Sequence, residues 1–258
     1  MPNKQLQKSL QQNLLQNNGF LIVASVSRAY YVSAINLAKS ILDFYPEARI
    51  TLFTQLEFFE EQHRNLFDVV DLTAPHHSRA KLYALPKTPY DITAYIDADC
   101  EVQDEDISTM FDQLGDADIM MTRIRDYSGA DLFISENEYL YWHCGVFLYR
   151  KTPLVIQMMQ DWWTEYDYQR HVQPWPWAPH SEKMRPWDQY TFYRLYTSDK
   201  YSKVKIEVFP GEDARWNYVH NYNSDEVTKD PIIFHYTLKR SDVDAGRINK
   251  EQTTSSNT

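Results

Sequence analysis

Short apolar runs alternate with longer segments of helical spacing along most of this chain, and this alternation constrains its fold more than any other feature. Residues 20–24 are apolar throughout, as in strands that are buried on both faces of a sheet. Residues 31–44 carry apolar side chains at helical spacing. Further strands are expected at 49–53, 68–72, 92–96, 119–123 and 145–150, and further helices at 57–66, 104–114, 153–166 and 189–196. The alternation predicts an α/β, Rossmann-like fold with a mostly parallel central sheet and helices on both faces.

The chain is long enough for one large domain. Of its 258 residues 43% are hydrophobic, so a sizeable core can form. We predict that residues 18–245 form this domain. Residues 1–17 are expected to be a polar leader or a short helix, because their leucines recur at helical spacing. Residues 246–258 lack an apolar anchor, which predicts a flexible C-terminal tail.

Charge and cysteine content limit the kinds of partner and the cellular compartment that we expect for this chain. The formal net charge of −10 argues against a nucleic acid as the main partner, because such binding depends on many contacts from Lys and Arg to phosphates. The cysteines, Cys100 and Cys144, have no metal-site spacing and fit a reducing compartment. No apolar run approaches the ~20 residues of a membrane-spanning helix. We therefore expect a soluble, cytoplasmic protein without a membrane span.

The triplet Asp97-Ala98-Asp99 follows the apolar run at 92–96 directly. Both carboxylates would therefore emerge at the carboxyl end of a buried strand, where open α/β sheets bind their ligands. Two neighbouring carboxylates repel each other unless a cation lies between them, and a hard divalent ion could also bind a nucleotide diphosphate. The alternative is a pair of acidic residues that caps a turn at the end of the strand.

His235 ends another apolar run, at 232–234, and is the candidate third metal ligand. An imidazole beside carboxylates favours Mn²⁺ over Mg²⁺, because Mg²⁺ prefers shells made of oxygen alone. A histidine after a strand can also be a hydrogen-bonded structural residue. We therefore expect Mn²⁺, or Mg²⁺, at a site made by Asp97, Asp99 and His235.

Several weak motifs occur in an order that is more specific than any one of them. They are Ser25-Val26-Ser27 with Tyr31, Lys81, Tyr95-Ile96-Asp97-Ala98-Asp99-Cys100, Trp142 to Tyr149, Pro186-Trp187-Asp188-Gln189 and Phe234-His235-Tyr236. Together they resemble glycosyltransferase family 8, which contains glycogenin and lipooligosaccharide galactosyltransferases. The resemblance covers about residues 20–239. It implies a GT-A fold and a retaining transfer of a sugar from a nucleotide diphosphate sugar, expected to be a UDP-sugar.

The resemblance also implies roles for single residues. Ser25 and Ser27 would bind the base or ribose, and Tyr31 would lie against the base. The diphosphate and donor sugar would contact Lys81, Arg79, the segment at 97–99 that includes Ala98, and the strand that carries His143 and Gly145. Asp188 and Gln189 would flank the anomeric carbon. Lys239 or Arg240 would replace the family's closing lysine at a shifted spacing.

Two departures from the family pattern concern the donor site. His143-Cys144 stands where the family has Asn-Ser, so the hydrogen bonds to the sugar differ. Arg185-Pro186-Trp187 precedes Asp188 where the family often has Asp-Gly-Gly. If the enzyme inverted configuration, Asp188 would be the candidate general base. It could equally cap the helix expected at 189–196.

The acceptor is a carbohydrate or another hydroxyl compound that the sequence does not identify. Trp175-Pro176-Trp177 could be a platform on which a sugar ring stacks, or a packed loop. Trp162 and Trp163 are expected in the core, and residues 126–138 could form a lid. Two other functions stay open: a non-catalytic relative that binds nucleotide sugars, and a nucleotidyltransferase. The second usually has a glycine-rich phosphate loop, and residues 24–27 contain no glycine.

Overall fold

The computed structural model describes residues 17–124, 133–135, 138–171, 188–219, 230–236 and 238. Within these ranges, seven strands form a central sheet in the order β10-β6-β9-β4-β1-β2-β3. Their bounds are β10 (Ile206–Val208), β6 (Ile119–Arg123), β9 (Trp142–Arg150), β4 (Ile92–Ile96), β1 (Asn18–Val23), β2 (Ile50–Phe53) and β3 (Val69–Asp71). The strands predicted from apolar runs are therefore confirmed.

The central sheet is mostly parallel, as predicted. β1 pairs in parallel with β2 and β4, β2 with β3, and β10 with β6. β9 is antiparallel to both of its neighbours, β4 and β6. Because β9 runs the other way, its N-terminal half lies beside the carboxyl end of β4. This arrangement brings 142–145 close to 97–99.

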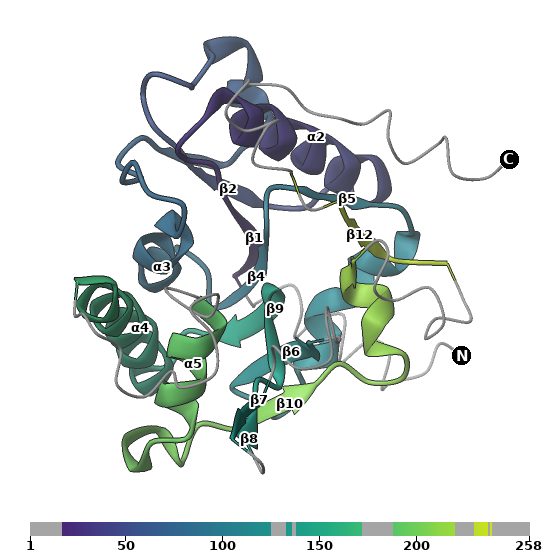
Figure 1. Ribbon diagram of the computed structural model, residues 1–258. Helices are drawn as coiled ribbons and strands as arrows, with labels where there is room; N and C mark the ends of the chain where they lie inside the picture. The colour runs from purple at the N-terminus through teal and green to yellow at the C-terminus, as the bar shows by residue number, and fades with distance from the viewer. Residues whose placement is uncertain are drawn as a thin grey trace, which may run out of the picture.

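Helices cover both faces of the sheet (Figure 1). Along β1, Phe20 and Ile22 belong to one buried cluster and Leu21 and Val23 to the other, as the period of two in a strand requires. The first cluster packs against α2, and the second contains residues of α3, α4 and α5. The bounds of these helices are α2 (Arg28–Phe44), α3 (Ala80–Ala84), α4 (Pro153–His171) and α5 (Asp188–Tyr196). The predicted single α/β domain with helices on both faces is thus observed.

A second, three-stranded sheet brings the C-terminal part of the domain to the metal motif. It consists of β11 (Tyr218–Val219), β12 (Ile233–His235) and β5 (Cys100–Val102). β12 is antiparallel to β5, and His235 lies opposite Cys100. The backbone N–H of Tyr236 donates to the carbonyl of Asp99 at 2.9 Å. This pairing places His235 beside the acidic triplet, although 136 residues separate it from Asp99 in the sequence.

Two of the predicted helices have 3-10 geometry. η1 (Glu61–Leu66) is shorter than expected and contains no buried residue, so it has no apolar face on which a longer helix could pack. η3 (Glu105–Leu114) begins after Asp104, whose carboxylate accepts from the N–H of Asp106 at 2.8 Å, so the predicted cap is confirmed. The other short elements are η2 (Leu85–Lys87), η5 (Asp199–Tyr201), η6 (Asp213–Asn217), β7 (Phe133–Ser135) and β8 (Glu138–Tyr139).

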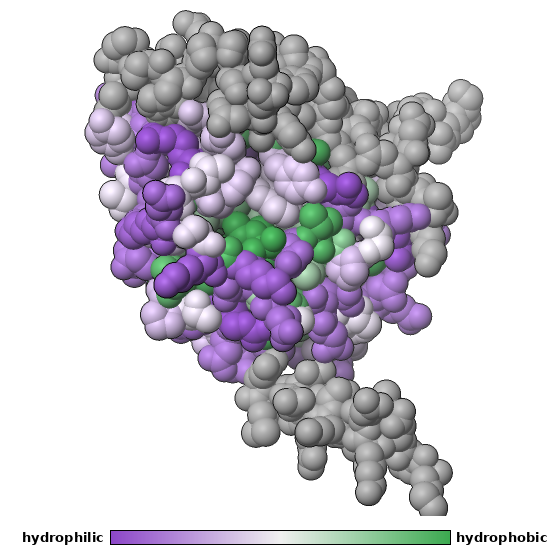
Figure 2. Space-filling model, turned by 90° about the horizontal axis from the view of Figure 1, so that it is seen from below, coloured by the Kyte–Doolittle hydropathy of each residue, from purple (hydrophilic) through white to green (hydrophobic). Residues whose placement is uncertain are grey.

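The surface seen in Figure 2 is mainly hydrophilic, with a compact group of hydrophobic side chains at its centre. Exposed apolar side chains of this kind are common in folded proteins. Among the helices that the structure describes, none is both long and apolar enough to span a membrane. The predictions for residues 1–16 and 246–258 lie outside the described residues.

Candidate functional site

A pocket with a volume of about 290 Å³ lies at the carboxyl ends of β1 and β4. Its walls come from segments that are far apart in the sequence. The predicted site residues that line it are Ser25, Arg79, Lys81, Asp97, Ala98, Asp99, His143, Gly145, Asp188, Gln189 and His235. The volume is at the small end of the range for ligand pockets, about 300–1,000 Å³. The fold therefore gathers most of the residues that were singled out from sequence into one place.

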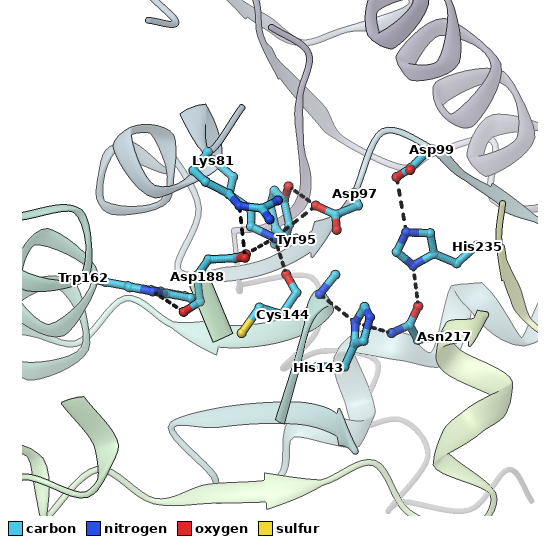
Figure 3. Close-up of polar contacts among 12 residues, drawn as sticks. Lys81, Tyr95, Asp97, Asp99, His143, Cys144, Trp162, Asp188, Asn217 and His235 are labelled. Atoms are coloured by element: carbon cyan, nitrogen blue, oxygen red, sulfur yellow. Dashed lines mark hydrogen bonds and ion pairs between the residues drawn. The ribbon is translucent and has the colours of Figure 1, made fainter. Parts of the chain in front are cut away.

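Lys81 is the buried centre of one half of this pocket (Figure 3). Its Nζ donates to Asp188 Oδ2 at 2.7 Å, to the carbonyl of Cys144 at 2.7 Å and to Asp97 Oδ1 at 3.3 Å. A lysine ammonium has three N–H groups, so all of its donors have partners. Lys81 thus joins α3 to β9, α5 and the acidic triplet.

Asp188 is the first residue of α5, and two cations hold its carboxylate. Arg79 Nε lies 3.2 Å from Asp188 Oδ1, and Lys81 binds the other oxygen. Burial alone would raise the pKa of Asp188, but Arg79 and Lys81 outweigh it and hold that pKa well below its usual range. The backbone carbonyl of Asp188 accepts from Trp162 Nε1 at 3.0 Å. Asp188 is therefore a fixed anion, and a weak base.

The acidic triplet divides its two carboxylates between different partners. Asp97 Oδ1 accepts from Tyr95 Oη at 2.5 Å, and burial raises the pKa of Asp97. Asp99 Oδ1 lies 3.3 Å from His235 Nε2, and Asp99 Oδ2 accepts from the N–H of Leu238 at 3.0 Å. Against the effect of burial, His235 lowers the pKa of Asp99 well below its usual range. Both carboxylates line the same pocket, and Figure 3 shows Asp97 on the Tyr95 side and Asp99 on the His235 side.

His235 is also connected to His143 through Asn217 (Figure 3). His235 Nδ1 lies 2.9 Å from Asn217 Oδ1, and Asn217 Nδ2 lies 2.8 Å from His143 Nδ1. His143 Nδ1 also accepts from the N–H of Gly145 at 3.0 Å, and Asn217 Nδ2 donates to Thr122 Oγ1 at 3.1 Å. Burial, together with the nearby His235 and Lys81, lowers the pKa of His143 to about 3. His143 is therefore a neutral imidazole.

The residues that could hold a metal ion differ in part from the predicted set. Within the described ranges, ligand atoms of Asp99, Cys100 and His235 lie within 4.8 Å of one another, whereas Asp97 is not a member of this group. Burial raises the pKa of Cys100 to about 11, so its sulfur is a protonated thiol that would have to lose its proton to bind a metal ion. The predicted triad of Asp97, Asp99 and His235 is thus only partly assembled, because Tyr95 and Lys81 hold Asp97 on the other side.

The charge of the pocket is compatible with a bound cation. Asp97, Asp99 and Asp188 contribute three negative charges, and Arg79 and Lys81 contribute two positive charges. Although burial opposes it, Cys100 and Asp99 raise the pKa of His235 well above its usual value, so the protonated imidazole supplies the third positive charge. A divalent cation that displaces this proton would replace that charge. Carboxylate oxygens with an imidazole nitrogen are donors that Mn²⁺ accepts. The residues present therefore fit a divalent cation.

Gly145 allows β9 to come close to the acidic triplet at 97–99. A Cβ at this position would come within 2.7 Å of His143 Cε1 and 2.9 Å of Asp97 Oδ2. The carbonyl of Gly145 accepts from the N–H of Asp97 at 2.7 Å, so the two segments are bonded backbone to backbone. The glycine is required here by the close contact of β9 with the acidic triplet.

The prediction that Tyr31 contacts a base is not supported by its position. Tyr31 is fully buried, and its Oη accepts from the N–H of Glu60 at 3.0 Å and lies 3.1 Å from His63 Nδ1. Tyr30 lines the pocket instead. Neighbouring helical residues point about 100° apart, so only one of the two tyrosines can face the site.

The two serines of the loop between β1 and α2 also differ in position. Ser25 lines the pocket, and its Oγ lies 2.5 Å from the carbonyl of Pro75 and 3.0 Å from Gln55 Oε1. Ser27 is the N-cap residue of α2 and is not part of the pocket wall; its buried Oγ has no hydrogen-bond partner among the described residues. Of this pair, only Ser25 is placed to meet a ligand.

Among the residues of the site that were not singled out from the sequence are Tyr30, His77, Tyr95 and Asn217. Tyr30 and Tyr95 stand next to predicted positions, and helix and strand periodicity could have found them. Asn217 and His77 have no sequence signal, because only the folding of distant loops brings them here. The predictions for Lys239, for Trp175-Pro176-Trp177 and for most of 126–138 lie outside the described residues.

No family model matches this chain, and no curated protein matches it in sequence. Solved structures do match. The galactosyltransferase LgtC, in complex with donor and acceptor sugar analogs, has a TM-score of 0.53 and 15% identity over 85% of this chain and 87% of that chain. GlyE of Streptococcus pneumoniae has a TM-score of 0.59 and 15% identity over 92% of this chain and 58% of that chain.

A third similar structure is a glycosyltransferase involved in the glycosylation of the major capsid of PBCV-1. Its TM-score is 0.51, with 13% identity over 88% of this chain and 97% of that chain. At these identities the likeness concerns the fold. The chain therefore has the GT-A-type fold of known glycosyltransferases, as its resemblance to family 8 predicted.

Proposed function

We propose that this chain is a metal-dependent glycosyltransferase. It would move a sugar from a nucleotide diphosphate sugar, expected to be a UDP-sugar, to a hydroxyl group of an acceptor. The observation that carries the proposal is the pocket at the carboxyl ends of β1 and β4, in which two carboxylates and an imidazole face two cations. The fold shared with glycosyltransferases supports the same chemistry.

Asp99 and His235 would hold the divalent cation, with Asp97 as an oxygen ligand from the opposite side. Mn²⁺ suits this set better than Mg²⁺, because one donor is an imidazole. When bound, the cation supplies positive charge where negative charge develops on the leaving diphosphate. Because a divalent cation carries one more positive charge than the proton it would displace from His235, a nucleotide sugar would then meet a pocket with an excess of positive charge.

Arg79 is better placed than Lys81 to contact the diphosphate. All three N–H groups of Lys81 already have protein partners. Arg79 forms an ion pair with Asp188, and its side chain remains 30% exposed in the pocket wall. Lys81 would therefore keep Asp97 and Asp188 in position, and Arg79 would bind phosphate oxygens, with Ser25 and Tyr30 nearer to the nucleoside.

The state of Asp188 supports a retaining reaction. An inverting enzyme needs a general base for the acceptor hydroxyl. Asp188 is paired with two cations, and its lowered pKa makes it a poor acceptor of that proton. Asp188 would instead orient the cations, and the neighbouring Gln189, which also lines the pocket, would lie near the anomeric carbon.

The test is a panel of nucleotide sugars measured by thermal unfolding and by donor hydrolysis, with and without Mn²⁺. A ligand that binds the folded state raises its stability by mass action. We expect a UDP-sugar to raise Tm only when Mn²⁺ is present, and to be hydrolysed slowly. The Asp99→Asn variant should lose activity by about 10²–10³-fold. Asp161→Asn, which removes an ion pair with Lys200 far from the pocket wall, is the matched control.

The alternative functions give different results in the same panel. Binding of a UDP-sugar without hydrolysis or transfer to any hydroxyl acceptor would favour a non-catalytic relative. Release of pyrophosphate from a nucleoside triphosphate would favour a nucleotidyltransferase. If no nucleotide sugar changed Tm with Mn²⁺ present, the proposed function would be wrong.

A further inference from the structure

One hydrogen-bond chain in the pocket has donor and acceptor roles that the protein itself fixes. It runs from the N–H of Gly145 through His143 and Asn217 to His235 (Figure 3). His143, Asn217 and His235 are all buried. The positions of protons on histidine and asparagine are normally ambiguous, because rings and amides can be flipped. Here the backbone N–H of Gly145, which is the first member of this hydrogen-bond chain, removes that ambiguity.

The backbone N–H of Gly145 can only donate a hydrogen bond. His143 Nδ1, at 3.0 Å from it, must therefore be an acceptor and carries no proton. The atom of Asn217 that faces the same nitrogen at 2.8 Å must then be its NH₂ group, since a carbonyl oxygen there would place two acceptors against each other. Thr122 Oγ1, at 3.1 Å, accepts from the same NH₂ group, which agrees with this orientation.

The orientation of Asn217 decides the state of His235. With NH₂ toward His143, the carbonyl oxygen Oδ1 of Asn217 faces His235 Nδ1 at 2.9 Å, so Nδ1 must carry a proton. The other ring nitrogen of His235, Nε2, is the one that points at Asp99, at 3.3 Å. Because a carboxylate only accepts, Nε2 also carries a proton as long as no metal ion is bound. A metal ion that displaces this proton would bind the lone pair of Nε2, while Nδ1 keeps its proton.

We propose that Asn217 is a positioning residue that fixes the tautomer and the ring orientation of His235, so that Nε2 is presented to a divalent cation beside Asp99. The orientation of Asn217 is in turn set by the Gly145 N–H through His143. This inference rests on the proposed function, because the ligand role of His235 is part of it. It also gives His143, which replaces the family's asparagine, a role within the protein.

The strand geometry explains why the chain can form. The pairing of β6 with β9 shifts register between Met121 and Thr122, so that Thr122 lies opposite His143. Irregular pairing of this kind re-aims side chains next to active sites. As a result Thr122 and His143 both reach Asn217, which ends η6.

The proton positions can be measured without a metal ion. Protein labelled with ¹⁵N at its 8 histidines would be studied by two-bond ¹H–¹⁵N correlation. We expect a protonated Nδ1 for His235 and an unprotonated Nδ1 for His143, with assignments from His143→Asn and from His235→Gln. A proton on Nδ1 of His143, or none on Nδ1 of His235, would overturn the inference.

The effect on the cation is measured as the affinity of the full chain for Mn²⁺ by electron paramagnetic resonance. Residues that orient a metal-bound histidine typically contribute 10–100-fold to metal affinity. Asn217→Leu removes the acceptor for His235 Nδ1 and should weaken Mn²⁺ binding by about this factor. Asn217→Asp keeps that acceptor and should weaken binding less, although it buries a charge. If Asn217 had only a structural role, the Mn²⁺ affinities of the two variants would instead follow their stabilities.

The matched control is Gln169→Leu. Gln169 is a buried amide between α4 and α5 that bonds to Thr191 at 3.0 Å and to Glu165 at 2.9 Å, away from the pocket wall. It should lower stability and leave Mn²⁺ affinity unchanged. If folded Asn217→Leu bound Mn²⁺ as tightly as the wild type, the inference would fail while the proposed function stood. If the wild type did not bind Mn²⁺, the proposed function itself would fail.

Discussion

The two halves of the pocket handle charge in opposite ways. In the cation half, made by Arg79, Lys81 and Asp188, ion pairs within the protein connect all three side chains and leave one positive charge. In the acid half, made by Asp97, Asp99 and His235, two carboxylates meet one imidazole, whose pKa Cys100 and Asp99 raise well above its usual value against the effect of burial. With this imidazole protonated, the acid half has one negative charge. The charge of the cation half is therefore fixed by permanent ion pairs, whereas the charge of the acid half depends on a proton at His235, which a bound cation would replace.

The largest effect on stability is expected when the cation half loses its anion. Asp188→Asn leaves Lys81 and Arg79 without the carboxylate that pairs with both of them. Removing one partner from a buried ion pair costs about 3–5 kcal/mol. We expect a loss of this size in the free energy of unfolding at pH 7, measured by urea denaturation. Asp161→Asn breaks a more exposed pair with Lys200 and should cost at most about 1 kcal/mol.

The ion pairs of Asp188 also predict how the stability difference between wild type and Asp188→Asn depends on pH. The folded-state pKa of Asp188 lies below its value in an unfolded chain, about 3.9. The ion pairs therefore stabilise the protein at pH values above about 4, and this contribution is lost as the pH falls toward the folded-state pKa. The difference in stability between wild type and Asp188→Asn should be constant near neutral pH and should shrink below about pH 4. A constant difference down to pH 3 would show that Asp188 is not held as an anion.

An intermediate effect is expected at the contact between the two halves. Gly145→Ala places a methyl group against His143 and the carboxylate of Asp97. Overpacking of this kind typically costs about 1–3 kcal/mol, and we expect Mn²⁺ affinity to fall as well because Asp97 must move. Gly211→Ala is the control, since Gly211 has a φ of 73° and nothing within 4 Å of its added Cβ. It should lower stability without changing Mn²⁺ affinity, and an equal loss of affinity in both variants would contradict the role of Gly145.

The smallest effects are expected at the two adjacent tyrosines of α2, where one substitution should change nucleotide affinity and the other should change stability. Tyr30→Leu removes an aromatic ring from the pocket wall, and we expect nucleotide affinity to fall about fivefold, equivalent to about 1 kcal/mol. Tyr31→Phe removes the hydroxyl that bonds to Glu60 and His63, which should cost about 1 kcal/mol of stability and leave nucleotide affinity unchanged. Isothermal titration with UDP and Mn²⁺ would compare them. The reverse pattern would restore the base-contacting role predicted for Tyr31.

Much of the fold could be predicted from local patterns. The strands β1, β2, β4 and β6 follow apolar runs, and α2 and α4 follow helical spacing, because burial on one or two faces imposes these periods. At η1 and η3 the sequence predicted helices without distinguishing 3-10 from α geometry, and at η1 it could not show that no residue of the segment is buried. The antiparallel direction of β9 was also not predicted, since direction depends on the path of the chain between strands.

The candidate site, like the fold, could be predicted only in part. Asp97, Asp99, Lys81 and Asp188 were selected by order and spacing, and they lie in one pocket. The pairing of Lys81 with Asp188 was not predicted, because 107 residues separate them and only the packing of α3 and α5 against α4 brings them together. Asn217 was missed for the same reason.

The sequence by itself determined six of the seven strands of the central sheet, all but β10, and which acidic residues follow its fourth predicted strand. Local hydrophobic periods and strand ends depend on neighbouring residues. Only the tertiary structure decided that Tyr30 and not Tyr31 faces the pocket, that Asp97 pairs with Lys81, and that Asn217 connects two histidines. The physical reason is that hydrogen bonds and ion pairs act over about 3 Å in space, whereas their partners are distant along the chain.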